Sequence, residues 1–158
     1  NRLARRVRDE AGVRTVVHQH LGTLIETGAE VRRLMAMTDP DLLGICLDTG
    51  HWTFGTGENP VDAVREFGDR IWHVHFKDCS PQVHEQSRRN EWNYFDSLKH
   101  GIFCELGKGD IDFKAFAAEL KRDGYPGSIV VEQDVLPGMG APKEFARRNR
   151  EFLRSCNL

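Results

Sequence analysis

The sequence lacks any long apolar run, and no stretch approaches the ~18 apolar residues of a membrane-spanning helix. No run of Lys or Arg exceeds two residues, and the basic start RLARRVR alternates with apolar residues as a helix would. With a net charge of −2 and a pI near 6.4, the chain has no basic face of the kind that binds nucleic acid. We therefore expect no nucleic acid partner and no membrane partner. No signal peptide is recognisable either, which favours a cytoplasmic protein.

Paired cysteines are also missing. The four cysteines lie far apart and form no CxxC motif; they are Cys46, Cys79, Cys104 and Cys156. This pattern indicates reduced thiols in a cytoplasmic protein rather than a disulfide framework or a structural zinc site.

The chain has 158 residues, enough for one domain with a sizeable core. It starts with Asn, and its first dozen residues resemble the middle of a helix. We therefore expect an N-terminal part of the protein to precede it.

Four short apolar runs alternate with helical patterns along the chain. Strands are predicted at 13–20, 41–48, 70–76 and 128–132. Helices are predicted at 2–11, 27–37, 60–68, 82–99, 112–122 and 142–156. Thr27 and Glu30 form a capping-box pattern, and Pro60 stands where a first helical turn accepts proline.

Buried strands that alternate with helices predict an α/β fold with a parallel sheet. The two architectures to compare are a doubly wound sheet and a (β/α)8 barrel. No GxGxxG or Walker-type loop follows a predicted strand, which weakens the nucleotide-binding sheet. About four βα units make half of a TIM barrel.

Each predicted strand ends in polar residues. The strand ends carry His18, Gln19 and His20; Asp48 with His51 close behind; His73, His75, Lys77 and Asp78; and Glu132, Gln133 and Asp134. The carboxyl ends of parallel strands meet at one edge, which is the active-site face of a barrel. We therefore expect these side chains to converge.

Strand periodicity refines this expectation, because alternate residues share a face. His73 and His75 share one face, as do Cys46 and Asp48. Carboxylates together with imidazoles suit Mn, Co, Zn, Ni or Fe better than Ca or Mg. A single histidine of this kind is more often a hydrogen-bonded core residue, but three strand ends together favour a metal site. Other residues are interpreted structurally: Cys46 as core, Trp52, Trp72 and Trp92 as core or pocket wall, and His84 and His100 as surface.

The motifs HQHLGTLIET, LDTGH, HVHFKD, GKGDIDF and IVVEQD, in this order, resemble the xylose isomerase-like TIM barrels. That superfamily includes sugar isomerases and epimerases, hydroxypyruvate isomerase, inosose dehydratase and, more remotely, AP endonucleases. The likeness is greatest to the inosose (2-keto-myo-inositol) dehydratase subgroup. It covers nearly the whole chain but only the C-terminal half of such a barrel. Residues 1–158 are therefore expected to be the C-terminal part of a single TIM barrel domain.

The resemblance implies a divalent metal ion, with Mn or Co favoured over Zn or Mg. Its ligands would include Asp48, His75 and Glu132. The sequence departs from the family pattern at the first ligand, a glutamate, where His18 stands, or His20 if the register slips. Glu26, in the following loop, is an alternative fourth ligand.

The resemblance also implies roles around the metal. His51 and Lys77 would contact substrate and take part in catalysis, while His20 and Glu26 would help to bind substrate. His73 would lie one layer deeper and orient His75.

Replacing the first glutamate by imidazole makes a symmetric proton shuttle between two carboxylates doubtful, so we expect dehydration of a keto-polyol. Glu132 would abstract the proton beside the ketone, His51 or His18 would protonate the leaving hydroxyl, and Lys77 would polarise an oxygen. A sugar (phosphate) isomerase or epimerase is the alternative, and an inactive half-barrel fragment is a further one. A homodimer is one arrangement that would supply the missing strands. The chain shows neither the extra metal ligands nor the basic groove of an AP endonuclease.

Overall fold

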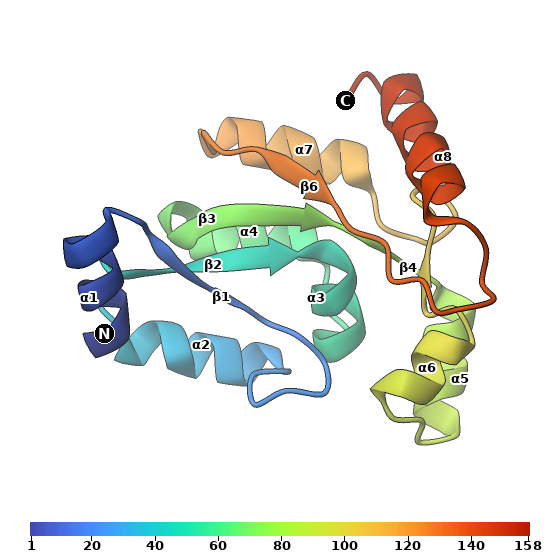
Figure 1. The fold of residues 1–158 in the computed structure, drawn as a ribbon, viewed down its shortest axis with the longest axis horizontal. Helices are drawn as coiled ribbons and strands as arrows, with labels where there is room; N and C mark the ends of the chain where they lie inside the picture. The colour runs from blue at the N-terminus through green and yellow to red at the C-terminus, as the bar shows by residue number, and fades with distance from the viewer.

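The computed structural model describes residues 1–158, and its centre is a four-stranded sheet in the order β1-β2-β3-β6 (Figure 1). All neighbouring strands are parallel. The strands are β1 (Thr15–His18), β2 (Leu43–Asp48), β3 (Ile71–Phe76) and β6 (Ile129–Val131). All four predicted strands are present, each shorter than predicted by one or two residues at one or both ends.

Five helices agree with the predictions. They are α1 (Arg2–Ala11), α2 (Gly28–Met37), α4 (Pro60–Phe67), α7 (Phe113–Arg122) and α8 (Pro142–Ser155). The predicted capping box is formed: the Thr27 side chain accepts from the Glu30 amide, and the Glu30 side chain accepts from the Thr27 amide. Asp112 caps α7 by accepting from the amide of Ala115. None of the helices is long and apolar enough to cross a membrane.

The prediction of one helix over 82–99 is wrong. This segment forms α5 (Pro81–Arg89) and α6 (Tyr94–Lys99). Glu91 between them has a φ of 53°, which a continuing helix does not allow. The Asn93 side chain then caps α6 by accepting from the amide of Asp96.

Several short elements were not predicted. Helix α3 (Thr49–Thr56) follows β2 directly, and a short 3-10 helix, η1 (Gly68–Arg70), precedes β3. Strands β4 (Asp78–Cys79) and β5 (Phe103–Cys104) form a separate antiparallel pair. This pair ties the segment after β3 to the glycine-rich loop before α7.

The main core lies on one face of the sheet. Ile45, Leu47, Val74 and Phe76 point to this face, as predicted, and pack with residues of α2, α4 and α7 in a cluster of 16 buried residues. The other face has no such cover, and on it Val130 is 43% exposed. The edge strands β1 and β6 each have one neighbour. A sheet with one covered face and two open edges corresponds to half of a barrel.

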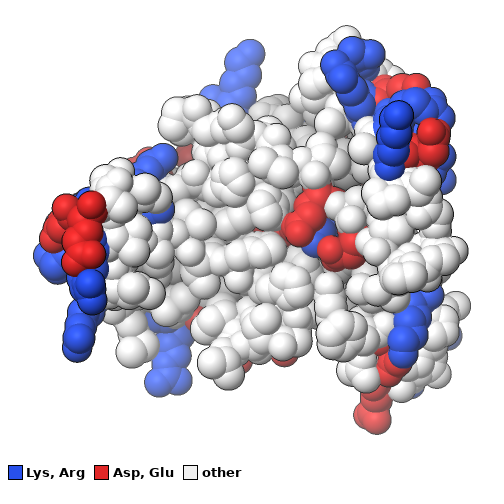
Figure 2. Space-filling view, viewed as in Figure 1, with Lys and Arg blue, Asp and Glu red and all other residues white.

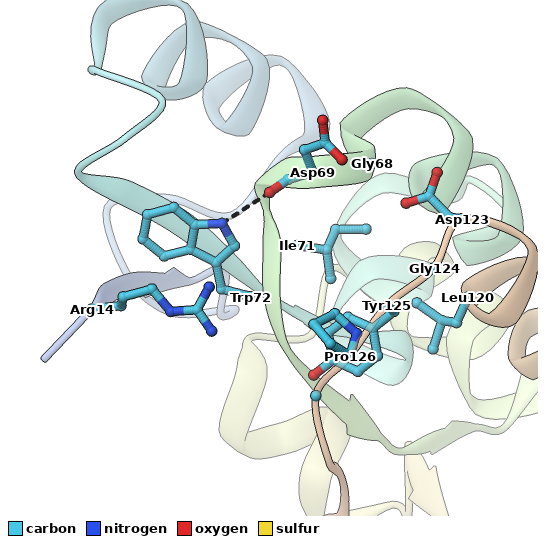
Figure 3. A pocket seen from close by; sticks show the side chains of 11 residues that line it. Arg14, Gly68, Asp69, Ile71, Trp72, Leu120, Asp123, Gly124, Tyr125 and Pro126 are labelled. Atoms are coloured by element: carbon cyan, nitrogen blue, oxygen red, sulfur yellow. Dashed lines mark hydrogen bonds between the residues drawn. The ribbon is translucent and has the colours of Figure 1, made fainter.

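A cavity of about 220 Å³ lies at the amino ends of the strands (Figure 3). The indole N–H of Trp72 donates to the carbonyl oxygen of Asp69 at 2.9 Å. The Arg14 guanidinium lies 5.1 Å from the centroid of the same indole. These contacts lie at the amino-terminal end of the sheet. Barrel chemistry takes place at the opposite end, at the carboxyl ends of the strands.

Candidate metal centre

Four side chains meet at the carboxyl ends of the sheet strands. His18 ends β1, Asp48 ends β2, His75 is near the end of β3, and Glu132 follows β6; one donor atom of each lies within 4.8 Å of all the others. The space-filling view shows a largely uncharged central face with one compact group of acidic and basic atoms near the ends of β3 and β6 (Figure 2). The structure thus brings together the four residues expected from the sequence.

The spacing of these atoms suits one ion. Asp48 Oδ2 lies 3.6 Å from His18 Nε2 and 3.5 Å from His75 Nδ1. Glu132 Oε2 lies 2.8 Å from His75 Nδ1. A tetrahedral ion with ligand distances of ~2.1 Å separates its donors by about 3.4 Å. Two of the three measured spacings are close to that value.

The four donor atoms make no well-formed hydrogen bond. His18 Nε2, Asp48 Oδ2, His75 Nδ1 and Glu132 Oε2 are buried atoms without a hydrogen-bond partner of acceptable geometry. Buried polar atoms are normally satisfied, so four orphans in one place need an explanation. A divalent cation bound by two imidazoles and two carboxylates would satisfy all four, and the residues present fit such an ion.

Local structure orients Asp48. Its Oδ1 accepts the amide of His51 at 2.8 Å and so caps α3, which leaves Oδ2 for the site. Burial would raise the pKa of this fully buried carboxyl, but His18, His75 and Lys77 hold the pKa well below its ordinary value. Asp48 is therefore an ionised ligand candidate whose position is fixed by the fold.

Protonation in the free protein follows from these contacts. Asp48, together with Cys46 and Glu132, raises the pKa of His75 to about 11. Contact with His75, and the charge of Lys77, lowers the pKa of Glu132. The carboxylates are thus ionised at neutral pH and His75 carries the proton. An ion bound at His75 displaces that proton.

Lys77 lies beside the donor group, next to Asp48 and Glu132, and is fully buried. Its Nζ is 3.2 Å from Glu132 Oε2 and 3.0 Å from both Asp134 Oδ2 and His51 Nε2. Burial alone lowers the pKa of Lys77, but the charges of Asp48, Asp134 and Glu132 outweigh it and raise the pKa. The ammonium therefore stays charged and faces both site carboxylates.

His51 is also fully buried, and its ring lies 3.9 Å from that of His20. Burial is the main cause that lowers the pKa of His51 to about 2, so its imidazole is neutral. Its Nε2 contacts Lys77, while its Nδ1 has no partner.

The remaining sequence candidates lie outside the four-donor group. The Nδ1 of His20 lies 2.6 Å from the carbonyl of Leu21, and the Glu26 carboxylate accepts the amide of Gly22 in the same loop. The ring of His73 is 5.2 Å from that of His75. Of the three alternatives for the fourth ligand, the structure places His18 with the other donors.

Asp134 and Tyr94 also reach the site. Asp134 is among the strand-end residues expected to converge but was given no role, and Tyr94 was not predicted. Asp134 Oδ2 accepts from Lys77 at 3.0 Å and from the Tyr94 hydroxyl at 3.4 Å. The Tyr94 ring packs 5.2 Å from the ring of His20. The sequence position of Asp134 points to the site, because this residue lies two positions after Glu132 at a strand end. Nothing in the sequence points to Tyr94, because it lies on α6, in the segment predicted as a single helix.

The sequence matches known proteins over nearly its whole length. An inosose dehydratase from Lacticaseibacillus casei is 38% identical over 152 residues, which cover 96% of this chain and 50% of the relative. An inosose dehydratase from Geobacillus kaustophilus is 38% identical over 144 residues, covering 91% of this chain and 46% of the relative. The chain therefore spans about half the length of these curated relatives.

Solved structures agree on the fold. A 3-keto-D-glucoside 4-epimerase from E. coli superposes with a TM-score of 0.69 at 23% identity, covering 98% of this chain and 51% of the other. A probable 3-DHS dehydratase from Bacillus anthracis superposes with a TM-score of 0.70 at 19% identity, covering 98% of this chain and 54% of the other.

The family model described as "Xylose isomerase-like TIM barrel" matches residues 1–156. With the half-barrel sheet and the relatives above, this match shows that the chain belongs to the xylose isomerase-like TIM barrel family.

Proposed function

We propose that this chain carries the metal centre of a keto-polyol dehydratase, with inosose (2-keto-myo-inositol) as the substrate class. The observation that carries the proposal is the four-donor group His18, Asp48, His75 and Glu132, whose facing atoms are buried without a hydrogen bond of acceptable geometry. The curated relatives named inosose dehydratase support the substrate class. A divalent ion bound there would stabilise negative charge on an oxygen of the substrate.

Glu132 is the group best placed to take a proton from substrate. Its side chain is 35% exposed, more than those of Asp48, His75 and His18, so a substrate can reach it from the open side. Its lowered pKa keeps it ionised at neutral pH. Glu132 would remove the proton from the carbon next to the ketone, and the electron pair left there would expel the hydroxyl group on the neighbouring carbon.

The departing hydroxyl needs a proton to leave as water. Lys77 is charged and within 3.2 Å of Glu132 Oε2, so its ammonium can donate to an oxygen held at the same place. His51 is neutral, and its Nε2 contacts Lys77, so it would orient Lys77. The geometry therefore favours Lys77 over His51 as the proton donor, while His18 serves as a ligand.

A test measures water loss from 2-keto-myo-inositol by the 158-residue chain with Mn²⁺, Co²⁺ or Zn²⁺. We expect a cyclic 1,2-diketone product, formed when the enol left by the loss of water tautomerises, and no activity after chelation. Conversion of simple ketoses to their isomers, without loss of water, would favour the isomerase or epimerase alternative. Metal binding without turnover of either class would favour the inactive-fragment alternative. Failure to bind any divalent ion would overturn the proposal.

A further inference from the structure

A buried thiol lies directly under the metal centre. Cys46 is on β2, two residues before Asp48, and therefore on the same face and one step deeper. It is 3% exposed and is paired in register with His18 of β1. One donor atom each from His18, Cys46 and His75 also lies within 4.8 Å of the others.

Cys46 is buried, as interpreted from the sequence, but its surroundings differ from those of a cysteine in an apolar cluster. Cys79 packs in an apolar cluster with Leu98, Ile102 and Phe103. Cys46 belongs neither to that cluster nor to the main core. It lies close to an imidazole nitrogen of His18 and one of His75.

We propose that His18, Cys46 and His75 form a second, softer metal site, which binds a strongly thiophilic ion such as Cd²⁺. Two imidazoles and a thiolate are a donor set that selects such ions, whereas carboxylates suit Mn²⁺ and Mg²⁺. Three protein ligands leave one position open on a tetrahedral ion. The thiol loses its proton to solvent when the ion binds, and no oxidant or reductant is needed.

The two sites exclude one another because they share His18 and His75. An ion held by Asp48 and Glu132 lies at the carboxyl edge, where substrate arrives. An ion held by Cys46 lies deeper and leaves Glu132 without its ion. A soft ion is therefore an inhibitor of the proposed activity, and the protein distinguishes hard from soft divalent ions by position. This consequence rests on the proposed function, but the existence of the soft site does not.

The test is a titration of the 158-residue chain with Cd²⁺, followed by the ultraviolet charge-transfer absorption of a thiolate–cadmium bond. We expect one such bond per chain and its loss in Cys46→Ser. The matched control is Cys104→Ser, which removes a half-buried thiol elsewhere and keeps the absorption. Mn²⁺ binding, measured by electron paramagnetic resonance, should be unchanged in Cys46→Ser.

Asp48→Asn separates the two sites in the other direction. It should lose Mn²⁺ and keep the cadmium–thiolate absorption. An absorption that is absent in the unsubstituted chain, or that survives in Cys46→Ser, would overturn the soft site. If Cys46→Ser does not fold, cadmium NMR on the unsubstituted chain decides, because its chemical shift separates sulfur ligation from oxygen and nitrogen ligation. In the unsubstituted chain, failure to bind Mn²⁺ with an intact cadmium signal would refute the proposed function alone.

Discussion

Asp48 and His75 are paired in register on neighbouring strands, and Asp48 Oδ2 lies 3.5 Å from His75 Nδ1. The other oxygen of Asp48 caps α3. The parallel register thus aims one carboxylate oxygen and one imidazole nitrogen at the same point, and the cap prevents the carboxylate from turning away.

Asp48→Asn tests the ligand role without removing the cap, because the amide oxygen of Asn can still accept the His51 amide. We expect Mn²⁺ or Co²⁺ affinity to fall by at least about 100-fold, since mutation of the residues that support a metal site already costs up to that much. Titration calorimetry measures the affinity. The melting temperature of the metal-free variant should fall, because His75 and Lys77 lose a buried charged partner. Unchanged affinity would remove Asp48 from the ligand set.

Glu132→Gln tests the base. The amide keeps the shape of the side chain but cannot take a proton, so we expect turnover to fall by at least about 10². The matched control combines Glu132→Gln with Gln133→Glu. This adds a carboxylate at the next position and should not restore turnover. Near-normal turnover in Glu132→Gln would contradict the assignment.

Asp134→Asn tests whether Asp134 positions Lys77. A hydrogen bond to a charged group stabilises by about 1.5–3 kcal/mol, so we expect turnover to fall by roughly tenfold with metal affinity unchanged. Tyr94→Phe removes only the 3.4 Å contact and serves as the control, with a smaller loss. The reverse order, or a loss of metal binding in Asp134→Asn, would show that Asp134 does not act through Lys77.

Glu105 gives a pH-dependent contribution to stability that is independent of the metal centre. The Arg148 guanidinium on α8, and Lys108, lower the pKa of this buried carboxyl below its ordinary value of 4.5. A lowered folded-state pKa means that the contribution is present above pH 4.5 and is lost as the pH falls through the folded-state value. Urea unfolding as a function of pH should therefore show a steeper acid loss for the natural chain than for Glu105→Gln. The same loss of unfolding free energy at acid pH in both proteins would contradict this role.

The convergence of the strand ends that carry the donor group could be predicted, because parallel strands bring their ends together whatever lies between them. The choice of ligands came from the family resemblance, which left His18, His20 and Glu26 open as the fourth. His18, Asp48 and His75 stand at strand ends that are defined by apolar runs, so an error of one or two residues in strand length did not move them to another face. Tyr94 could not be found in this way. Its position depends on the break at Glu91 and on the packing of a short helix. Neither feature produces a periodic pattern of apolar residues in the sequence.

The proposed role of Cys46 could not be predicted from the sequence either. Alternation places it on the inward face, but a small residue there is equally compatible with a packed layer. Only its distance from His18 and His75, and its absence from both apolar clusters, separate a ligand from a packing residue.

The uncovered sheet face leads to a last prediction. Val16 on β1 is 36% exposed and Val130 on β6 is 43% exposed, and both edge strands have unpaired backbone groups along one side. Exposed apolar edges of this kind recruit further strands. We therefore expect the 158-residue chain to self-associate, and sedimentation velocity over a range of concentrations measures this.

Val130→Lys places a charge on the exposed face of an edge strand and should weaken the association, because a lysine at such an edge opposes strand pairing. Leu24→Lys is the matched control, since Leu24 is 93% exposed in the loop after β1 and not on the sheet, and it should associate like the unsubstituted chain. Equal weakening by both variants would mean that association is not through the sheet. A stable monomer with full activity at every concentration would show that this face needs no partner, because catalysis would then be complete within four strands.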